Sequence, residues 1–282
     1  SNLLAALLGI LAYSLLNIGF FLQKRAAASL PSIESIDAKA NLKNFLTNKQ
    51  WLVGYLLTVI QTFPFWIALS IGSITVVTPM IGVGLIVFVV ISVVIEKEPL
   101  SKFEIAGIAF IVVGLVVIGI TSEQDSRVWT FQEMVGVFGS PQSIVFLVVS
   151  LVAAILTFIL PALLKYKLSD VFYGLSSGIF TTFGAILSKA FMSAINAEAG
   201  GSLQFALSQG LWWLFFILFV ISTGGSLIGQ QMGYQKGKGV IVVSIFNVMT
   251  VLGPSLGGVI MFNEWENVDS NTIIFKVIAY VL

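Results

Sequence analysis

The stretch LLAALLGILAYSLLNIGFFL, residues 3–22, contains no charged side chain and decides the class of fold. At about 1.5 Å of rise per residue, 20 helical residues cross the ~30 Å hydrocarbon core of a bilayer. Similar runs recur along the 282 residues, of which 57% are hydrophobic and only 10% charged. Soluble domains carry about 25% charged residues. The sequence therefore predicts an all-α integral membrane protein.

About nine apolar runs are predicted to cross the membrane. They are residues 3–22, 51–70, 74–95, 104–121, 143–163, 171–193, 211–229, 239–261 and 272–282. The first run has no basic segment before it and no small-residue cleavage site after it. We therefore expect it to be a retained span and not a signal peptide.

Basic residues set the predicted orientation, because Lys and Arg accumulate in cytoplasmic loops. If the N-terminus lies outside and the C-terminus lies in the cytoplasm, Arg127 alone falls in an outer loop. Eleven fall in inner loops: Lys24, Arg25, Lys39, Lys43, Lys49, Lys97, Lys102, Lys165, Lys167, Lys236 and Lys238.

Two connections between spans are long enough for structure of their own. Residues 26–50 are predicted to hold a short surface helix on the cytoplasmic side. Residues 122–142 lie outside and mix aromatic with charged side chains. They form either a segment lying on the membrane surface or an ordinary loop with buried apolar side chains.

An internal repeat is indicated by matched residues at a nearly constant offset. Spans 1–4 resemble spans 6–9, and the single span between them gives the two copies opposite orientations. This predicts a first repeat at 1–121, an external segment with a linking span at 122–170, and a second repeat at 171–282. The matches are Gly9, Gly19 and Lys24 with Gly174, Gly184 and Lys189, and Val76, Val77, Thr78 and Glu98 with Val242, Val243, Ser244 and Glu264. Inverted repeats are typical of transporters that work by alternating access.

Short motifs add a family resemblance. The segment IGSITVVTPM at 71–80, followed by EKEPLS at 96–101, resembles the conserved block of the EamA-like drug/metabolite transporter superfamily. The segment from Val240 to Trp265, which ends in FNEW, and the Lys24-Arg25 pair are similar to the NIPA branch. The superfamily implies ten spans in two five-span repeats, and the NIPA branch implies nine spans and Mg²⁺ transport. The loss of one span from a clipped N-terminus is the other explanation for nine spans instead of ten.

A transporter needs polar residues near the midplane, often beside broken helices. Trp66 is the only tryptophan placed away from the interfaces, and it clusters with Gln61 and Pro64 in span 2. The candidate substrate-binding residues are Asn17, Gln61, Trp66, Thr78, Thr182, Ser222, Ser244 and Asn247, drawn from a wider set that includes Thr223 and Thr250. For each hydroxyl or amide, the alternative is an ordinary hydrogen bond between helices.

A second group of candidates concerns gating and hinges. It comprises Lys24, Lys189, Pro64, Pro79, Gly253 and Pro254. Lys189 lies four residues from the outer end of its span, so its ammonium group can also simply reach the interface. Glycine pairs with GxxxG spacing, such as Gly253 and Gly257, indicate close packing of helices.

The distribution of carboxylates guides the choice of substrate. All 13 acidic residues fall in loops or at span ends, so no midplane carboxylate is available to Mg²⁺, a hard ion that favours oxygen ligands. The sequence therefore predicts a secondary transporter of a small polar solute or metabolite. A NIPA-like Mg²⁺ transporter, with the hydrated ion held by amide and carbonyl oxygens, is the alternative. A membrane scaffold or a lipid-handling protein is a further one.

Several classes of function are excluded or disfavoured by composition. The chain has no cysteine and no histidine, which removes thiolate nucleophiles and the commonest metal ligands and proton shuttles. We therefore expect no enzyme activity, no metal centre, no cofactor and no nucleic-acid partner, only membrane lipids and the solute. A homodimer is left open. The chain has no Asn-x-Ser/Thr sequon, which favours a prokaryotic cytoplasmic membrane.

Overall fold

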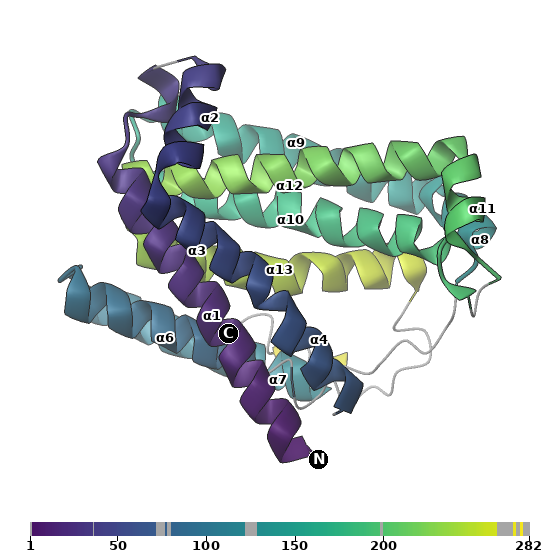
Figure 1. The fold of residues 1–282 in the computed structure, drawn as a ribbon, viewed down its shortest axis with the longest axis horizontal. Coiled ribbons are helices and arrows are strands. Elements are labelled where there is room, and N and C mark those ends of the chain that lie inside the picture. Colours follow the sequence, from purple (N-terminus) through teal and green to yellow (C-terminus); the bar gives the residue numbers. More distant parts are fainter. Residues whose placement is uncertain are drawn as a thin grey trace.

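The computed structural model describes residues 2–35, 37–71, 77, 80–121, 129–197, 200–263, 273–274 and 277–278, and every regular element in these ranges is helical (Figure 1). Five helices are long and apolar enough to cross a membrane. These are α1 (Asn2–Ser29), α9 (Pro141–Leu163), α10 (Ser169–Ser193), α12 (Gly210–Lys236) and α13 (Gly239–Phe262). They correspond to the first, fifth, sixth, seventh and eighth predicted spans.

The second predicted span is divided into two helices, α3 (Lys49–Ile60) and α4 (Thr62–Ile71). Pro64 causes the break, because proline has no N–H to donate to the carbonyl of Ile60, four residues earlier. Gln61 caps α3, and its carbonyl accepts a 3.2 Å hydrogen bond from the Phe65 N–H. A bend in the second span therefore replaces the continuous helix.

The third and fourth predicted spans contain α6 (Met80–Ile95) and α7 (Lys102–Thr121). Residues 72–76 and 78–79, in the first part of the third span, lie outside the described residues, as does most of the ninth predicted span. The nine spans expected from the sequence are therefore matched in part, up to α13.

The short helices lie in the connections. Helix α2 (Ala38–Thr47) follows the 3-10 turn η1 (Ile33–Ser35), and the carboxylate of Asp37 caps it by accepting from the N–H of Ala40. This is the surface helix expected in the 26–50 connection. Helix α8 (Phe131–Phe138) starts with a capping box, and α11 (Leu203–Ser208) precedes α12. Because Phe131 and Met134 of α8 are buried in the protein core, the described part of the 122–142 connection fits the alternative of a loop with buried apolar side chains.

The long helices form two packed sets. In the first, α1 packs against α3, α4 and α6; in the second, α10 packs against α9, α12 and α13 (Figure 1). Glycine permits close contact in both sets. A Cβ atom at Gly19 of α1 would lie 2.6 Å from the carbonyl oxygen of Gly54 in α3, and one at Gly253 of α13 would lie 1.8 Å from Oγ1 of Thr182.

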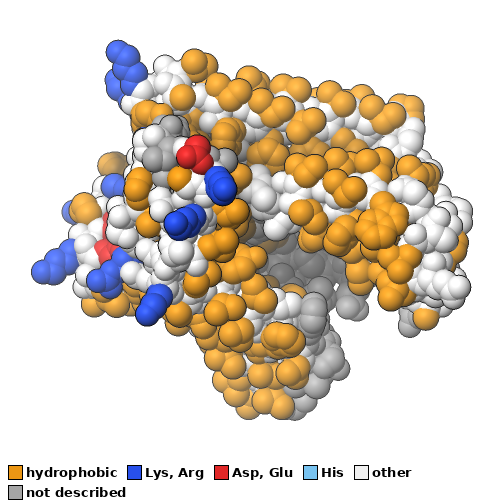
Figure 2. All heavy atoms as spheres, turned by 45° about the horizontal axis from the view of Figure 1, so that its top comes forward, with side chains coloured by type: hydrophobic (Ala, Val, Ile, Leu, Met, Phe, Trp, Pro, Cys, Tyr) orange, Lys and Arg blue, Asp and Glu red, His pale blue; other side chains and the backbone are white. Residues whose placement is uncertain are grey.

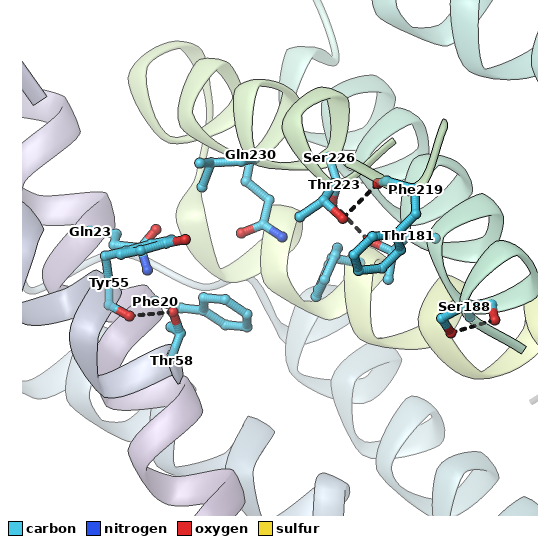
Figure 3. Close-up of a pocket in the computed structure, with 14 residues that line it drawn as sticks. Phe20, Gln23, Tyr55, Thr58, Thr181, Ser188, Phe219, Thr223, Ser226 and Gln230 are labelled. Carbon is cyan, nitrogen blue, oxygen red and sulfur yellow. Dashed lines mark hydrogen bonds between the residues drawn. The ribbon is translucent and has the colours of Figure 1, made fainter. Parts of the chain in front are cut away.

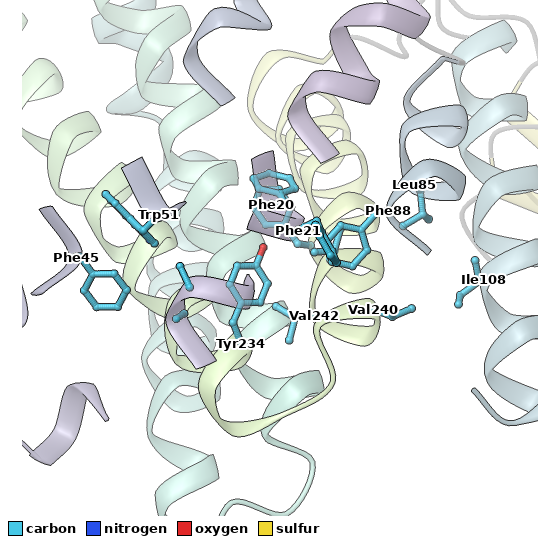
Figure 4. Close-up of a cluster of buried hydrophobic side chains, with 14 residues drawn as sticks. Phe20, Phe21, Phe45, Trp51, Leu85, Phe88, Ile108, Tyr234, Val240 and Val242 are labelled. Carbon is cyan, nitrogen blue, oxygen red and sulfur yellow. The ribbon is translucent and has the colours of Figure 1, made fainter. Parts of the chain in front are cut away.

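A buried cluster joins the two sets (Figure 4). Phe20 of α1 meets Phe246 of α13 edge to face, with ring centroids 5.6 Å apart. Tyr234 of α12 and Phe88 of α6 belong to the same cluster. Much of the contact between the sets is therefore apolar.

The outer surface is largely hydrophobic, as Figure 2 shows. Helix α9 is representative, because its exposed side chains include Val145, Val149, Val152 and Leu156. Transferring such a surface from water into lipid is favourable, and a surface of this extent exposed to water would be costly. Together with the five long apolar helices, this surface makes the chain an integral membrane protein.

Candidate functional site

A cavity of about 340 Å³ lies between the two helix sets (Figure 3). Helices α1 and α3 form one wall, and α10, α12 and α13 form the other. The lining residues are Phe20, Gln23, Tyr55, Thr58, Thr181, Gly184, Ala185, Ser188, Phe219, Thr223, Ser226, Leu227, Gln230 and Phe246. The cavity therefore lies between the segments expected to be the two repeats.

The cavity lies at mid-depth along the long helices. Thr223 stands 13 residues from each end of α12, which runs from Gly210 to Lys236. The lining residues of α12 extend from Phe219 to Gln230, eleven residues apart, or about 16 Å along the axis. This is about half of a ~30 Å hydrocarbon layer.

The hydroxyl groups of the lining present oxygen lone pairs to the cavity. Thr223 donates its hydroxyl hydrogen to the Phe219 carbonyl at 2.9 Å, Thr58 donates to Tyr55 at 2.7 Å, and Ser188 donates to Ala185 at 2.8 Å. A hydroxyl has one hydrogen and two acceptor lone pairs. Since each hydrogen is committed to the backbone of its own helix, these groups can only accept from a bound species.

At one end of the cavity, amide side chains form a buried hydrogen-bond chain. The indole N–H of Trp51 donates to Oε1 of Gln231 at 3.0 Å, and Nε2 of Gln231 donates to Oε1 of Gln23 at 3.0 Å. Gln230, next to Gln231, extends from α12 into the space between α12 and α1 (Figure 3), and its Oε1 accepts from the Tyr234 hydroxyl at 3.4 Å.

Charged side chains are absent from the lining among the described residues, and several of them form ion pairs at one end of the helices. The ammonium group of Lys24 forms ion pairs with Glu96 and Glu98, where α6 ends. Lys238, between α12 and α13, forms a 2.7 Å ion pair with Glu104 and donates to the Pro99 carbonyl at 3.2 Å. The hydrogen bond to Glu104 raises the pKa of Lys238, which therefore stays charged at neutral pH.

The Lys24 ion pairs lie within the first helix set, whereas Lys238 joins the α12–α13 connection of the second set to α7 and the Pro99 carbonyl. Within the described ranges, no group of three or more His, Cys, Asp or Glu residues is arranged to hold a metal ion. Among the described lining residues, the hydroxyl groups, amides and aromatic rings are the groups that can make polar or cation–π contacts with a solute.

None of the eight candidate substrate-binding residues lines the cavity in the part of the chain that the structure describes. Thr182 and Ser222 are the sequence neighbours of the lining residues Thr181 and Thr223. Thr182 lies at the contact of α10 with α13, where its hydroxyl is 3.1 Å from the Gly178 carbonyl and 3.4 Å from that of Met249. Thr78, Pro79 and the side chain of Trp66 lie outside the described residues.

Three other candidates are buried and incompletely hydrogen-bonded. Nδ2 of Asn17 donates to the Tyr13 carbonyl at 2.9 Å, but its Oδ1 has no partner among the described residues. In the same ranges, Oγ of Ser244 and Nδ2 of Asn247, on α13, have none either. Buried polar atoms without partners are unusual and often mark a place for water or a ligand. Gln61 is half-buried at the α3–α4 break.

The candidate gating residues take different positions. Lys24 is buried in the ionic contacts with Glu96 and Glu98, whereas the Lys189 ammonium lies 4.2 Å from the centroid of the Phe262 ring. Gly253 packs against Thr182, and Pro254 lies inside α13 without ending it. Gly253 and Gly257 thus lie in close helix contacts, as their GxxxG spacing indicates, while the hinge role of Gly253 and Pro254 stays a prediction.

Sequence reasoning passed over Gln23 and Gln230 because it ended the first span at 22 and the seventh at 229. The helices continue to Ser29 and Lys236, since glutamine, lysine and alanine are good helix formers. A signal was present, because Gln23 directly follows the first apolar run and Gln230-Gln231 directly follows the seventh.

Comparisons of the sequence with known proteins identify a family. The model of the family described as magnesium transporter NIPA matches residues 1–282. Probable magnesium transporter NIPA9 of Arabidopsis thaliana is 26% identical over 262 residues, covering 88% of this chain and 70% of the relative. Probable magnesium transporter NIPA5 of the same plant is 21% identical, covering 93% and 67%. No solved structure matches significantly.

Proposed function

Because the chain belongs to the NIPA magnesium transporter family, we propose that this membrane transporter carries Mg²⁺ as its substrate, through the cavity between the two helix sets. The relatives named as probable magnesium transporters favour Mg²⁺ over the small polar solute ranked first from the sequence. The family's transporters also argue against an enzyme. The main structural support for this proposal is a cavity at mid-depth along the helices, lined by hydroxyl oxygens with free lone pairs.

The cavity suits an ion that keeps its water. Mg²⁺ binds water oxygens at about 2.1 Å and dehydrates reluctantly. Its six waters, at about 30 Å³ each, fill about 180 Å³. That volume fits within the cavity of about 340 Å³. The outward hydrogens of the six waters need acceptors, and the hydroxyl oxygens of Thr58, Ser188 and Thr223 supply them.

We further propose alternating access by two inverted repeats, as in the drug/metabolite transporter superfamily that the sequence resembles. Matched glycines support this. A Cβ at Gly9 of α1 would meet Val77 and Met80, and one at Gly174 of α10 would meet Val242 and Ile245. Each glycine thus contacts the corresponding segment of its own half, 165 or 166 residues apart.

The proposed orientation has the N-terminus outside. The Lys and Arg side chains visible in Figure 2 gather at one end of the molecule. At that end, residues from three loops assigned to the cytoplasm meet, since Gln235 donates to the carbonyls of Ala27 and Pro31 and Lys238 contacts Glu104. A shared basic end is what the positive-inside rule requires.

One observation favours the second candidate, transport of a small polar organic solute. The amide Nε2 of Gln23 has no hydrogen-bond partner among the described residues, because the bonds of Gln23 engage only its oxygen. An amide N–H can donate to a carboxylate or carbonyl oxygen of such a solute.

Flux into proteoliposomes decides between the two. Purified protein is reconstituted around a fluorescent Mg²⁺ indicator, and uptake of Mg²⁺ is compared with that of labelled amino acids and amines. We expect protein-dependent Mg²⁺ uptake that saturates with concentration. Uptake of an organic solute without Mg²⁺ uptake would reverse the order of the two candidates. Uptake of neither would contradict the proposal that this cavity carries a transported substrate.

A further inference from the structure

Three buried side chains carry a hydrogen-bond relay from α3 through α12 to α1: Trp51, Gln231 and Gln23. They are 5%, 3% and 1% exposed, so water does not compete for these bonds. Of the three, only Gln23 lines the cavity. The relay therefore connects a tryptophan outside the site to an amide inside it.

The direction of the relay is forced by its first member. An indole N–H can donate but cannot accept, so the amide oxygen of Gln231 must face Trp51. The remaining atom of that amide is Nε2, which can only donate, so Gln23 must turn its oxygen toward Gln231. The Nε2 group of Gln23 is what remains for the cavity, and within the described residues it makes no hydrogen bond.

This orientation matters for a cation. An –NH₂ group offers hydrogens with positive partial charge and no lone pair, so it cannot replace a water molecule on a metal ion. Amide oxygens are ligands that Ca²⁺ takes directly. In this cavity the Gln23 oxygen faces Gln231 and the Gln230 oxygen faces Tyr234.

Resting on the proposed function, we propose that Trp51 and Gln231 are positioning residues that hold the Gln23 carbonyl oxygen out of the cavity. Mg²⁺ is then taken with its water shell intact, and ions that lose water more readily find no direct ligand in Gln23. If the relay is broken at Trp51, both amides can turn over together and keep their mutual hydrogen bond. Gln23 then offers its oxygen, which benefits Ca²⁺ more than Mg²⁺.

Trp51→Phe is the sharpest test, because it removes the indole N–H and keeps an aromatic ring. The Trp51 ring stacks on Tyr55, with centroids 5.3 Å apart, and meets Phe45 edge to face at 5.4 Å, so an aromatic ring is needed at this position. Uptake of Mg²⁺ and of Ca²⁺ is measured separately in proteoliposomes. We expect the ratio of Ca²⁺ to Mg²⁺ uptake to rise about fivefold, the equivalent of one hydrogen bond.

A second readout uses cobalt(III) hexaammine, whose six ammonia ligands do not exchange, so it can bind only through hydrogen bonds of its outer shell. It should inhibit Mg²⁺ uptake by the wild type and inhibit Trp51→Phe more strongly, because the Gln23 oxygen turned into the cavity accepts hydrogen bonds from the ammonia ligands. Gln231→Met breaks the same relay at its second link and should shift the Ca²⁺ to Mg²⁺ ratio in the same direction.

Trp212→Phe is the matched control. Trp212 is equally buried, and its indole donates to the Phe191 carbonyl at 3.0 Å, outside the relay. In a Gln23→Leu background, Trp51→Phe should no longer change the ratio, because the residue it acts through is gone. An unchanged ratio in Trp51→Phe, or a change that persists in Gln23→Leu, overturns the relay. A wild type without Mg²⁺ uptake overturns the proposed function and this inference together.

Discussion

Thr223 in the cavity wall can serve two partners. Thr223 gives its hydrogen to the Phe219 carbonyl one turn earlier in α12, which satisfies the hydroxyl locally in an apolar environment. The lone pairs of the same oxygen then face the cavity. A residue that looks like an ordinary helix-bonded threonine is thus an acceptor of fixed direction, and its contribution to transport can be separated from its contribution to folding.

Replacing Thr223 with valine keeps the shape of the side chain and removes the oxygen. We expect Mg²⁺ uptake to fall about fivefold, since one acceptor for the ion's water is lost. The control is Thr157→Val on α9, where the hydroxyl makes the same kind of bond, 2.7 Å to the Ala153 carbonyl, away from the cavity. Equal uptake by both variants would remove Thr223 from the site.

A second residue-scale prediction concerns the contact of α10 with α13. In Gly253→Ala the new Cβ would lie 1.8 Å from Oγ1 of Thr182, so a helix must shift. We expect thermal unfolding in detergent to show a loss of about 1–3 kcal/mol. Thr182→Ala should restore part of it, and Gly107→Ala, whose Cβ meets nothing within 4 Å, should cost nothing. A stable Gly253→Ala variant would contradict the close crossing.

At the scale of elements, the sequence identified the long helices well and their rotation poorly. Helices α1, α9, α10, α12 and α13 lie within a few residues of the predicted spans, except where Gln23 and Gln230-Gln231 extend α1 and α12. In lipid, however, both the outer and the packed faces of a helix are apolar, so periodicity does not indicate which face points inward.

The consequence is visible in two neighbouring pairs. Thr182 and Ser222 were chosen as substrate-binding candidates, whereas the cavity is lined by their sequence neighbours Thr181 and Thr223, of which Thr223 belonged to the wider set of candidates. One residue is a rotation of about 100° around a helix axis. The break at Pro64 was flagged as a hinge from the sequence, because the missing N–H of proline is a local property that needs no knowledge of packing.

The loop from α6 to α7 is held to the loop from α12 to α13 by Lys238, through Glu104 and the Pro99 carbonyl. Lys238→Met removes both contacts and should let this end open more often. With the cysteine-free chain carrying Ser226→Cys in the cavity, labelling by an impermeant maleimide from that end should become about threefold faster. Lys43→Met, an exposed lysine of α2, is the control, and equal labelling rates would show that this contact is not a gate.

At the scale of the whole molecule, the arrangement has a charged end, an uncharged middle and an apolar outer surface. Lys24, Glu96, Glu98 and Lys238 all lie where α1, α6 and α12 end. The plant relatives give no support to a prokaryotic membrane, which stays a prediction, as do the orientation and the homodimer.

The orientation can be tested on the same cysteine-free background. Lys43→Cys on α2 should be labelled by an impermeant maleimide only after the membrane of an intact cell is opened. Gln132→Cys on α8, at the other end, should be labelled on intact cells, since an odd number of spans separates the two positions. The reverse pattern would invert the topology, and labelling of both positions on intact cells would refute the assignment of opposite sides.

The uncharged lining has an energetic consequence. Because no Asp, Glu, Lys, Arg or His side chain lines the cavity among the described residues, we expect it to supply neither a counter-charge nor an exchanged proton, so that each transported Mg²⁺ carries two net charges across the bilayer. Moving two charges across a potential of 100 mV changes the free energy by about 4.6 kcal/mol, at ~2.3 kcal/mol for each charge. An inside-negative voltage of that size could alone sustain a concentration ratio of roughly three orders of magnitude. Transport should therefore be electrogenic, with cellular polarity as its driving force.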